Sequence, residues 1–166
     1  MRWVLALSIV IGCAMCGRSL TGSSRRRASL LEGLVRGVKL LRVHMTGMFE
    51  PLAQSLSRTE VPTFDAVADA MRGGMSANDS WEAVKRREFR RGGMLDALTR
   101  EDQQALDELF SRLGESGRDA QDILLDGASK RLAENLESAR VRAREAEKLY
   151  GSLGLLTGLM LALIAM

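Results

Sequence analysis

Uncharged, mostly apolar residues fill both ends of the chain, and the charged residues lie between them. No charged residue occurs in 3–17 or in 149–166. As helices rising about 1.5 Å per residue, these runs would extend about 22 Å and about 27 Å, against roughly 30 Å of hydrocarbon in a bilayer. The pattern predicts an N-terminal membrane anchor over 1–17, a linker over 18–24, a helical bundle over 25–148 and a C-terminal transmembrane helix over 149–166.

Through the middle of the chain, apolar residues recur at spacings of three and four, the period of an amphipathic helix. The first stripe predicts a helix over about 25–46 and consists of Leu30, Leu34, Val38, Leu41 and Met45. Four shorter helices follow between glycine and proline breakers. Their predicted starting signals are Pro51, Thr63 as a cap, a cap within 78–80 ahead of Trp81, and a capping box of Thr99 with Asp102.

From about Arg118 no strong breaker occurs before the glycines of the tail, so one long helix is predicted to leave the bundle and enter the membrane. No segment alternates apolar and polar residues in the manner of a strand. The predicted fold class is therefore all-α: a cytoplasmic helical bundle of about six helices, anchored by N- and C-terminal transmembrane helices.

Basic residues flank both apolar ends on their inner sides. They are Arg18, Arg25, Arg26 and Arg27 after the first run, and Arg140, Arg142, Arg144 and Lys148 before the second; only Arg2 lies outside. By the positive-inside rule the bundle should face the cytoplasm. Two alternatives remain for the N-terminal run: a retained anchor, or a signal segment that is cleaved or lipidated at Cys13, because Val10–Cys13 loosely resembles a lipoprotein acylation box.

The composition argues against several kinds of chemistry. The chain has 24 basic and 21 acidic residues, which alternate through the middle, and only 4% aromatics, so it lacks the aromatic-interleaved basic patch of a single-strand nucleic-acid binder. Cys13 and Cys16 lie in an apolar run without further metal ligands.

No motif joins a nucleophile to a base. The lone His44 is interpreted as a surface or packing residue, and Asp102, Asp107 and Glu108 as solvated helical faces. The sequence predicts no enzyme activity, no cofactor or metal, and neither nucleic acid nor a small-molecule substrate as a ligand.

The tail carries the most specific motif. Lys148, Tyr150 and the stretch Ser152–Gly154, followed by Gly158 and Leu159, resemble the K-x-Y-x-S-L-G-x-x-x-G-L tail of the stage III sporulation protein AB family of endospore-forming bacteria. Three other features fit the same family, in the same order: Pro51–Leu52, Trp81, and Leu113–Gly114 followed by Asp119 and Gln121. The likeness covers essentially the whole chain.

This resemblance implies a bundle similar to the cytoplasmic domain of the type II secretion F protein. It implies a non-catalytic platform subunit of a transenvelope complex between mother cell and forespore, in the mother-cell membrane. The implied partners are a cytosolic secretion-type ATPase, other membrane subunits and the bilayer. We expect a membrane-junction assembly site at Lys148, Tyr150, Gly154 and Gly158, because G-x-x-x-G permits close helix approach. The alternatives are a membrane-anchored adaptor or regulator outside any secretion system, and an exported lipoprotein-like factor.

Overall fold

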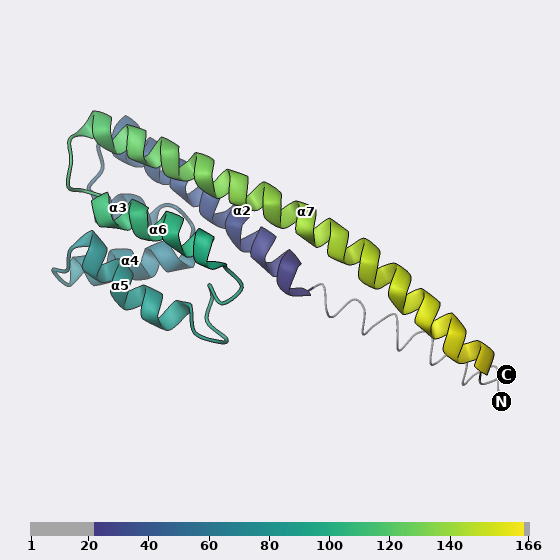
Figure 1. The fold of residues 1–166 in the computed structure, drawn as a ribbon. Helices are drawn as coiled ribbons and strands as arrows, with labels where there is room; N and C mark the ends of the chain where they lie inside the picture. Colours follow the sequence, from purple (N-terminus) through teal and green to yellow (C-terminus); the bar gives the residue numbers. More distant parts are fainter. Residues whose placement is uncertain (1–21, 165–166) are drawn as a thin grey trace. The chain divides into compact units, whose positions relative to one another are not determined.

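The computed structural model describes residues 22–164, and within that range every regular element is a helix (Figure 1). The all-α prediction is confirmed for this part of the chain. The described residues form two compact units. The first spans residues 29–137, and the second combines residues up to Ala28 with residues from Ser138 onward.

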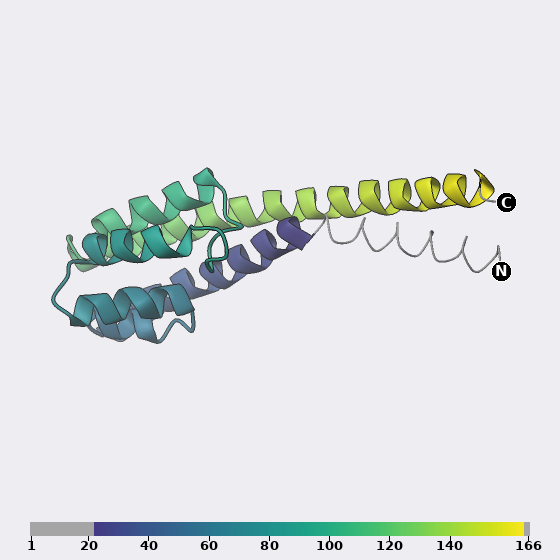
Figure 2. The same cartoon turned by 90° about the horizontal axis from the view of Figure 1, so that it is seen from below.

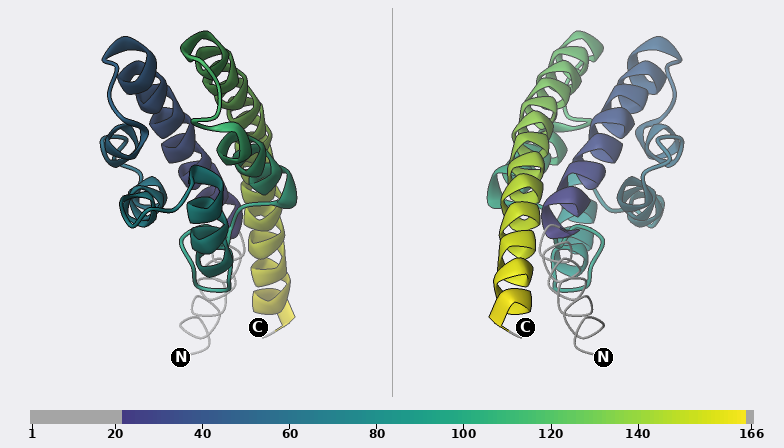
Figure 3. Two further views of the ribbon diagram at one scale, coloured as in Figure 1. Left: turned by 90° about the vertical axis from the view of Figure 1, so that its left-hand side faces the viewer. Right: turned by 90° about the vertical axis from the view of Figure 1, so that its right-hand side faces the viewer.

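Two long helices, α2 (Gly22–Arg42) and α7 (Arg118–Ile164), contribute to both units. Between them the first unit contains the π-helical turn η1 (Val43–Gly47) and the helices α3 (Leu52–Ser57), α4 (Pro62–Arg72), α5 (Ala77–Glu88) and α6 (Arg100–Arg112). Within this unit α2 and α7 lie alongside each other (Figures 2 and 3). The prediction of one unbroken helix from Arg118 into the tail is confirmed.

Aromatic side chains form the centre of the first unit. Trp81 is fully buried, as predicted, and its ring stacks on Phe110 with centroids 4.7 Å apart. Phe110 also receives the edge of Phe64 at 5.5 Å. The predicted stripe of α2 is partly confirmed, because Leu34, Val38 and Leu41 are buried; Leu30 and Met45 are only partly buried, and Leu31 and Val35 take their place in the core.

Two predicted helix caps are wrong by two to four residues. The cap of α4 is Val61 rather than Thr63, because Pro62 occupies the first helical position, where its missing N–H costs nothing. The cap of α5 is Ser76, whose hydroxyl accepts a hydrogen bond from the Asp79 N–H at 3.1 Å. The capping box of Thr99 and Asp102 on α6 is confirmed.

Asp102 corrects a further expectation, since it is buried rather than solvated. Its Oδ2 accepts from the Thr99 N–H at 2.9 Å, and its Oδ1 accepts from Asn135 Nδ2 at 2.9 Å. The carboxylate therefore caps α6 and also ties it to α7. Burial of this charge is possible because each oxygen has a donor.

The structure describes the end of the predicted linker and most of the predicted C-terminal transmembrane helix, but not the predicted N-terminal anchor. Helix α2 begins at Gly22, inside the predicted linker, and ends at Arg42, where η1 continues the chain to Gly47. The predicted N-terminal anchor, with Cys13 and Cys16, lies outside the described residues. Among residues 22–164, no helix has the length and apolar character needed to cross a membrane. Both transmembrane assignments stay predictions.

Candidate functional site

The predicted assembly residues all belong to α7. Lys148 is exposed, and its carbonyl accepts a hydrogen bond from Ser152 Oγ at 2.8 Å. Gly154 and Gly158 lie four residues apart in the same helix, which places them on one face. The Tyr150 side chain lies outside the described part of the structure. Helical backbone thus puts the two glycines in the register that the assembly hypothesis requires, and their role stays a prediction.

An ion pair lies immediately before Lys148 in the second unit. Arg25 Nη2 of α2 is 2.6 Å from Glu147 Oε1 of α7, and each side chain is about half exposed (52% and 58%). Nearby, Ala139 and Ala143 are buried on α7. An exposed pair of this kind contributes little to stability.

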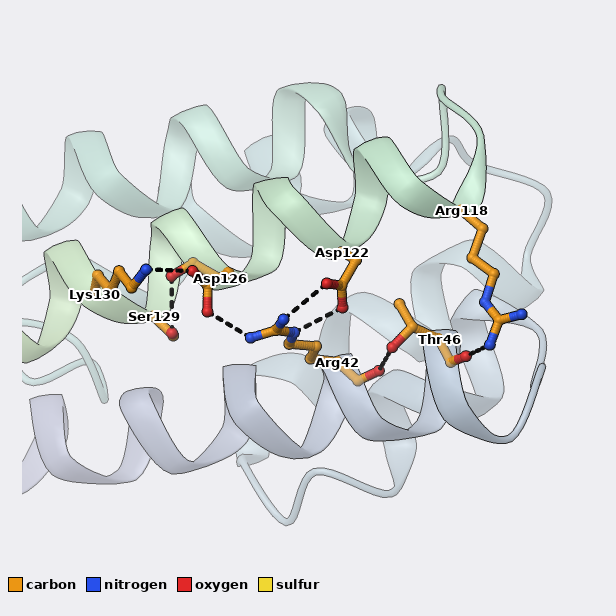
Figure 4. Close-up of polar contacts among 7 residues, drawn as sticks. All are labelled: Arg42, Thr46, Arg118, Asp122, Asp126, Ser129 and Lys130. Carbon is orange, nitrogen blue, oxygen red and sulfur yellow. Dashed lines mark hydrogen bonds and ion pairs between the residues drawn. The ribbon is translucent and has the colours of Figure 1, made fainter.

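The first unit contains a charged cluster where the end of α2 meets the beginning of α7 (Figure 4). Arg42 contacts both oxygens of Asp122, Nε to Oδ1 at 2.7 Å and Nη2 to Oδ2 at 2.7 Å. Its Nη1 also donates to Asp126, which in turn pairs with Lys130 at 2.6 Å. Such a bidentate guanidinium–carboxylate contact fixes the relative orientation of the two side chains in addition to their attraction. We call these four residues the Arg42 cluster.

The charges in the Arg42 cluster support one another. Hydrogen bonding from Arg42 holds the pKa of Asp122 below its usual range. For Asp126 the largest cause of a lowered pKa is the hydrogen bond from Lys130. The pKa of Arg42 is raised, chiefly through its hydrogen bond to Asp122. Arg42, Asp122 and Asp126 therefore remain charged near neutral pH, and the two helices stay joined by compensated charges.

A second set of contacts holds the turn after η1 against the start of α7. Arg118 stacks over the Phe49 ring at 3.8 Å from its centroid, and it donates a hydrogen bond to the Thr46 carbonyl (Figure 4). Phe49 has a φ of +58°, a region that bulky residues rarely adopt, and its side chain is 70% exposed. The stacked guanidinium is one contact that offsets this backbone strain.

A cleft between α6 and α7 in the first unit has a volume of about 530 Å³. Its lining is mainly aliphatic and includes Leu109, Ile123 and Leu124, with the Glu108–Arg131 ion pair beside them. Such a lining suits an apolar side chain better than a charged cofactor.

Within residues 22–164, no group of histidine, cysteine and acidic side chains is placed to hold a metal ion. His44 Nδ1 lies 3.2 Å from Glu50 Oε2, and Arg58 Nε lies 3.4 Å from the same oxygen. The His44 side chain is thus largely buried beside the carboxylate of Glu50, which Arg58 also approaches.

Sequence reasoning missed the Arg42 cluster. One signal was present, because Asp122, Asp126 and Lys130 recur every four residues on the predicted long helix and therefore share a face. Their partner Arg42 lies 80 residues from Asp122, and no local pattern connects the two.

The observations so far define an all-helical protein whose last helix runs from a folded bundle into an apolar tail. The model of the stage III sporulation protein AB family matches residues 2–166. Because the match covers nearly the whole chain, this protein belongs to the stage III sporulation protein AB family and is a sporulation-related protein. That family is not a known family of enzymes. No curated protein and no solved structure matches the chain.

Proposed function

We propose that this protein is a non-catalytic membrane platform subunit of a secretion-like transenvelope complex that connects mother cell and forespore during sporulation. The observation that carries the proposal is the continuity of α7. This helix begins with Arg118 in the bundle and continues to Ile164 in the apolar tail without an intervening loop. A platform needs such a connection, because a loop would separate the bundle from its anchor.

The proposed location and partners follow from charge and apolar character. The uncharged ends of the chain would lie in the mother-cell membrane around the forespore, and the basic residues beside them would keep the bundle in the cytoplasm. There the bundle would contact a cytosolic secretion-type ATPase, and the tail would contact other membrane subunits. Gly154 and Gly158 support the second contact, since glycines four residues apart permit close helix packing.

Co-purification from sporulating cells tests the proposal. Tagged full-length protein is isolated from membranes and its partners are identified by mass spectrometry. We expect a secretion-type ATPase and small membrane proteins. The variant G154L/G158L should remain in the membrane with its bundle folded, lose the membrane partners and block sporulation after engulfment. The matched control is Leu156→Ala, half a helical turn away from both glycines, which should assemble normally.

Two results would contradict the proposal. Wild-type protein that co-purifies only with proteins unrelated to secretion would favour the adaptor or regulator instead. A G154L/G158L variant that inserts, assembles and supports sporulation like wild type would move the assembly surface away from these glycines, towards the bundle.

A further inference from the structure

Four exposed arginines lie at the end of α5 and in the loop that joins it to α6. Arg86 donates to the Glu82 carbonyl at 3.2 Å, and Arg87 pairs with Glu88 at 2.7 Å. Residues 85–91 read Lys-Arg-Arg-Glu-Phe-Arg-Arg, and the exposed arginines are Arg86, Arg87, Arg90 and Arg91. We call these four residues the arginine surface. In the part of the chain that the structure describes, the side chains of Arg90 and Arg91 form no hydrogen bond or ion pair.

The loop that carries Arg90 and Arg91 is held in one shape by its own acidic residues. Glu88 is buried, and its Oε2 accepts from the Met94 N–H at 3.1 Å. Asp96 Oδ2 accepts from the Gly92 N–H at 3.0 Å. Glu88 at the end of α5 and Asp96 in the loop therefore bond to backbone N–H groups, and Glu88 also accepts from Arg87 at 2.7 Å. The positive charge of Arg90 and Arg91 is left to solvent.

The stability of α5 does not explain these charges. Cations favour the last turn of a helix through its dipole, but the effect fades beyond that turn. Helix α5 ends at Glu88, so Arg90 and Arg91 lie past the favourable region. Neither the helix dipole nor a partner within the described residues therefore accounts for Arg90 and Arg91.

We infer that the arginine surface docks on an acidic surface of a protein partner. Arginine matches carboxylates with two parallel hydrogen bonds, and arginine and methionine are enriched at protein interfaces while lysine is depleted. Met94 is 39% exposed in the same loop. The one lysine nearby, Lys85, contacts Glu82 and Asp107 instead. Because the loop is already ordered, docking would cost little conformational entropy.

The loop suits a membrane or a nucleic acid less well. Its single aromatic residue, Phe89, packs edge-on against the buried Trp81 with centroids 6.3 Å apart. The ring is therefore engaged within the bundle, whereas interfacial membrane binding uses apolar side chains inserted among headgroups and single-strand binding uses exposed aromatic platforms. The inference rests on the proposed function only in taking the partner to be a protein of the sporulation assembly.

Site-specific photo-crosslinking in sporulating cells tests this docking. The full-length chain carries p-benzoyl-phenylalanine in place of Met94, and crosslinked peptides are identified by mass spectrometry. We expect a crosslink to an Asp- and Glu-rich segment of another protein. R90E/R91E should lower its yield about tenfold or more, because opposed like charges cost several kcal/mol at an interface. R90K/R91K should give a yield between those of the parent and R90E/R91E, because lysine keeps the charge but loses the paired hydrogen bonds to carboxylates.

The matched control, R36E/K39E, reverses the charge of two exposed basic residues on α2. It should crosslink with the same yield as the parent. Circular dichroism of each purified variant checks that helicity is unchanged. Parental yield from R90E/R91E, a crosslink to lipid, or a crosslink to a segment without acidic residues would overturn the inference. If the proposed function were wrong but this inference right, the crosslink would still form and would depend on the arginine charges. Co-purification would then find no secretion-type subunits.

Discussion

At the scale of single residues, Trp81 belongs to a chain of aromatic contacts that joins three helices. It belongs to α5, stacks on Phe110 of α6 and donates its indole N–H to Asp107 Oδ1 at 2.6 Å. Phe110 in turn contacts Phe64 of α4. The indole is fully buried and its polar atom is satisfied, which is the condition under which tryptophan serves as a core residue.

Trp81→Ala should therefore lower the free energy of unfolding of the segment 24–148 by about 3–5 kcal/mol, the range for loss of a large buried side chain. Trp81→Phe is the control. It keeps a ring against Phe110 and loses the hydrogen bond to a carboxylate, a loss of about 1.5–3 kcal/mol. Urea denaturation followed by circular dichroism measures both. A neutral Trp81→Ala would show that the ring does not hold the helices together.

At the scale of elements, the packing of α2 depends on a glycine. A Cβ added at Gly37 would clash with Val61 Cγ2 and would lie 3.3 Å from Phe64 Cε2, so the absence of a side chain lets the start of α4 approach the helix. One turn earlier, a Cβ at Gly33 would meet no atom within 4 Å. The two glycines thus have the same helical backbone and opposite surroundings.

Substitution of these glycines should change stability in opposite directions. Gly33→Ala should raise the free energy of unfolding by about 0.5–1 kcal/mol, because alanine loses less backbone entropy in a helix. Gly37→Ala should instead lower it by about 1–3 kcal/mol, the usual range for overpacking a core. Paired thermal or urea unfolding curves give the comparison. Equal gains from both substitutions would mean that Val61 moves aside freely and that Gly37 is not a packing requirement.

At the scale of the whole molecule, the charge pattern predicts how the chain is oriented. In the sequence, the basic residues beside the two apolar ends all lie between those ends, and only Arg2 lies outside them. Orientation in the membrane follows this bias when the charges lie close to the spans. The bundle should therefore lie on the cytoplasmic side of the bilayer, and the two chain termini on the opposite side.

A topology reporter inserted at Gly92, in the exposed loop after α5, should show cytoplasmic activity. The same reporter placed after Met166 should show extracytoplasmic activity, because the tail is predicted to cross the bilayer once. Alkaline phosphatase and a cytoplasmic reporter such as a fluorescent protein provide the two readouts. Extracytoplasmic activity at Gly92 would reverse the orientation and support the exported alternative.

Local patterns in the sequence were enough to predict most elements and the family. The spacing of Leu34, Val38 and Leu41 marks the buried face of α2, and the absence of strong breakers after Arg118 marks α7. Thr99 and Asp102 indicate the start of α6 because a capping box is made by residues three positions apart in the sequence. The tail motif identified the family that the comparison then showed. Each of these signals is contained in a short window of the chain.

Only the tertiary structure decided which distant residues meet. Arg42 pairs with Asp122 across 80 residues, and Asp102 is buried because Asn135, 33 residues away, supplies a donor. The steric requirement for Gly37 arises from Val61 and Phe64 on another element. Propensity and periodicity act over one or two helical turns, whereas these contacts depend on how the helices pack. A charge that would suit a solvated face can therefore become part of the core once a neighbouring helix brings its partner.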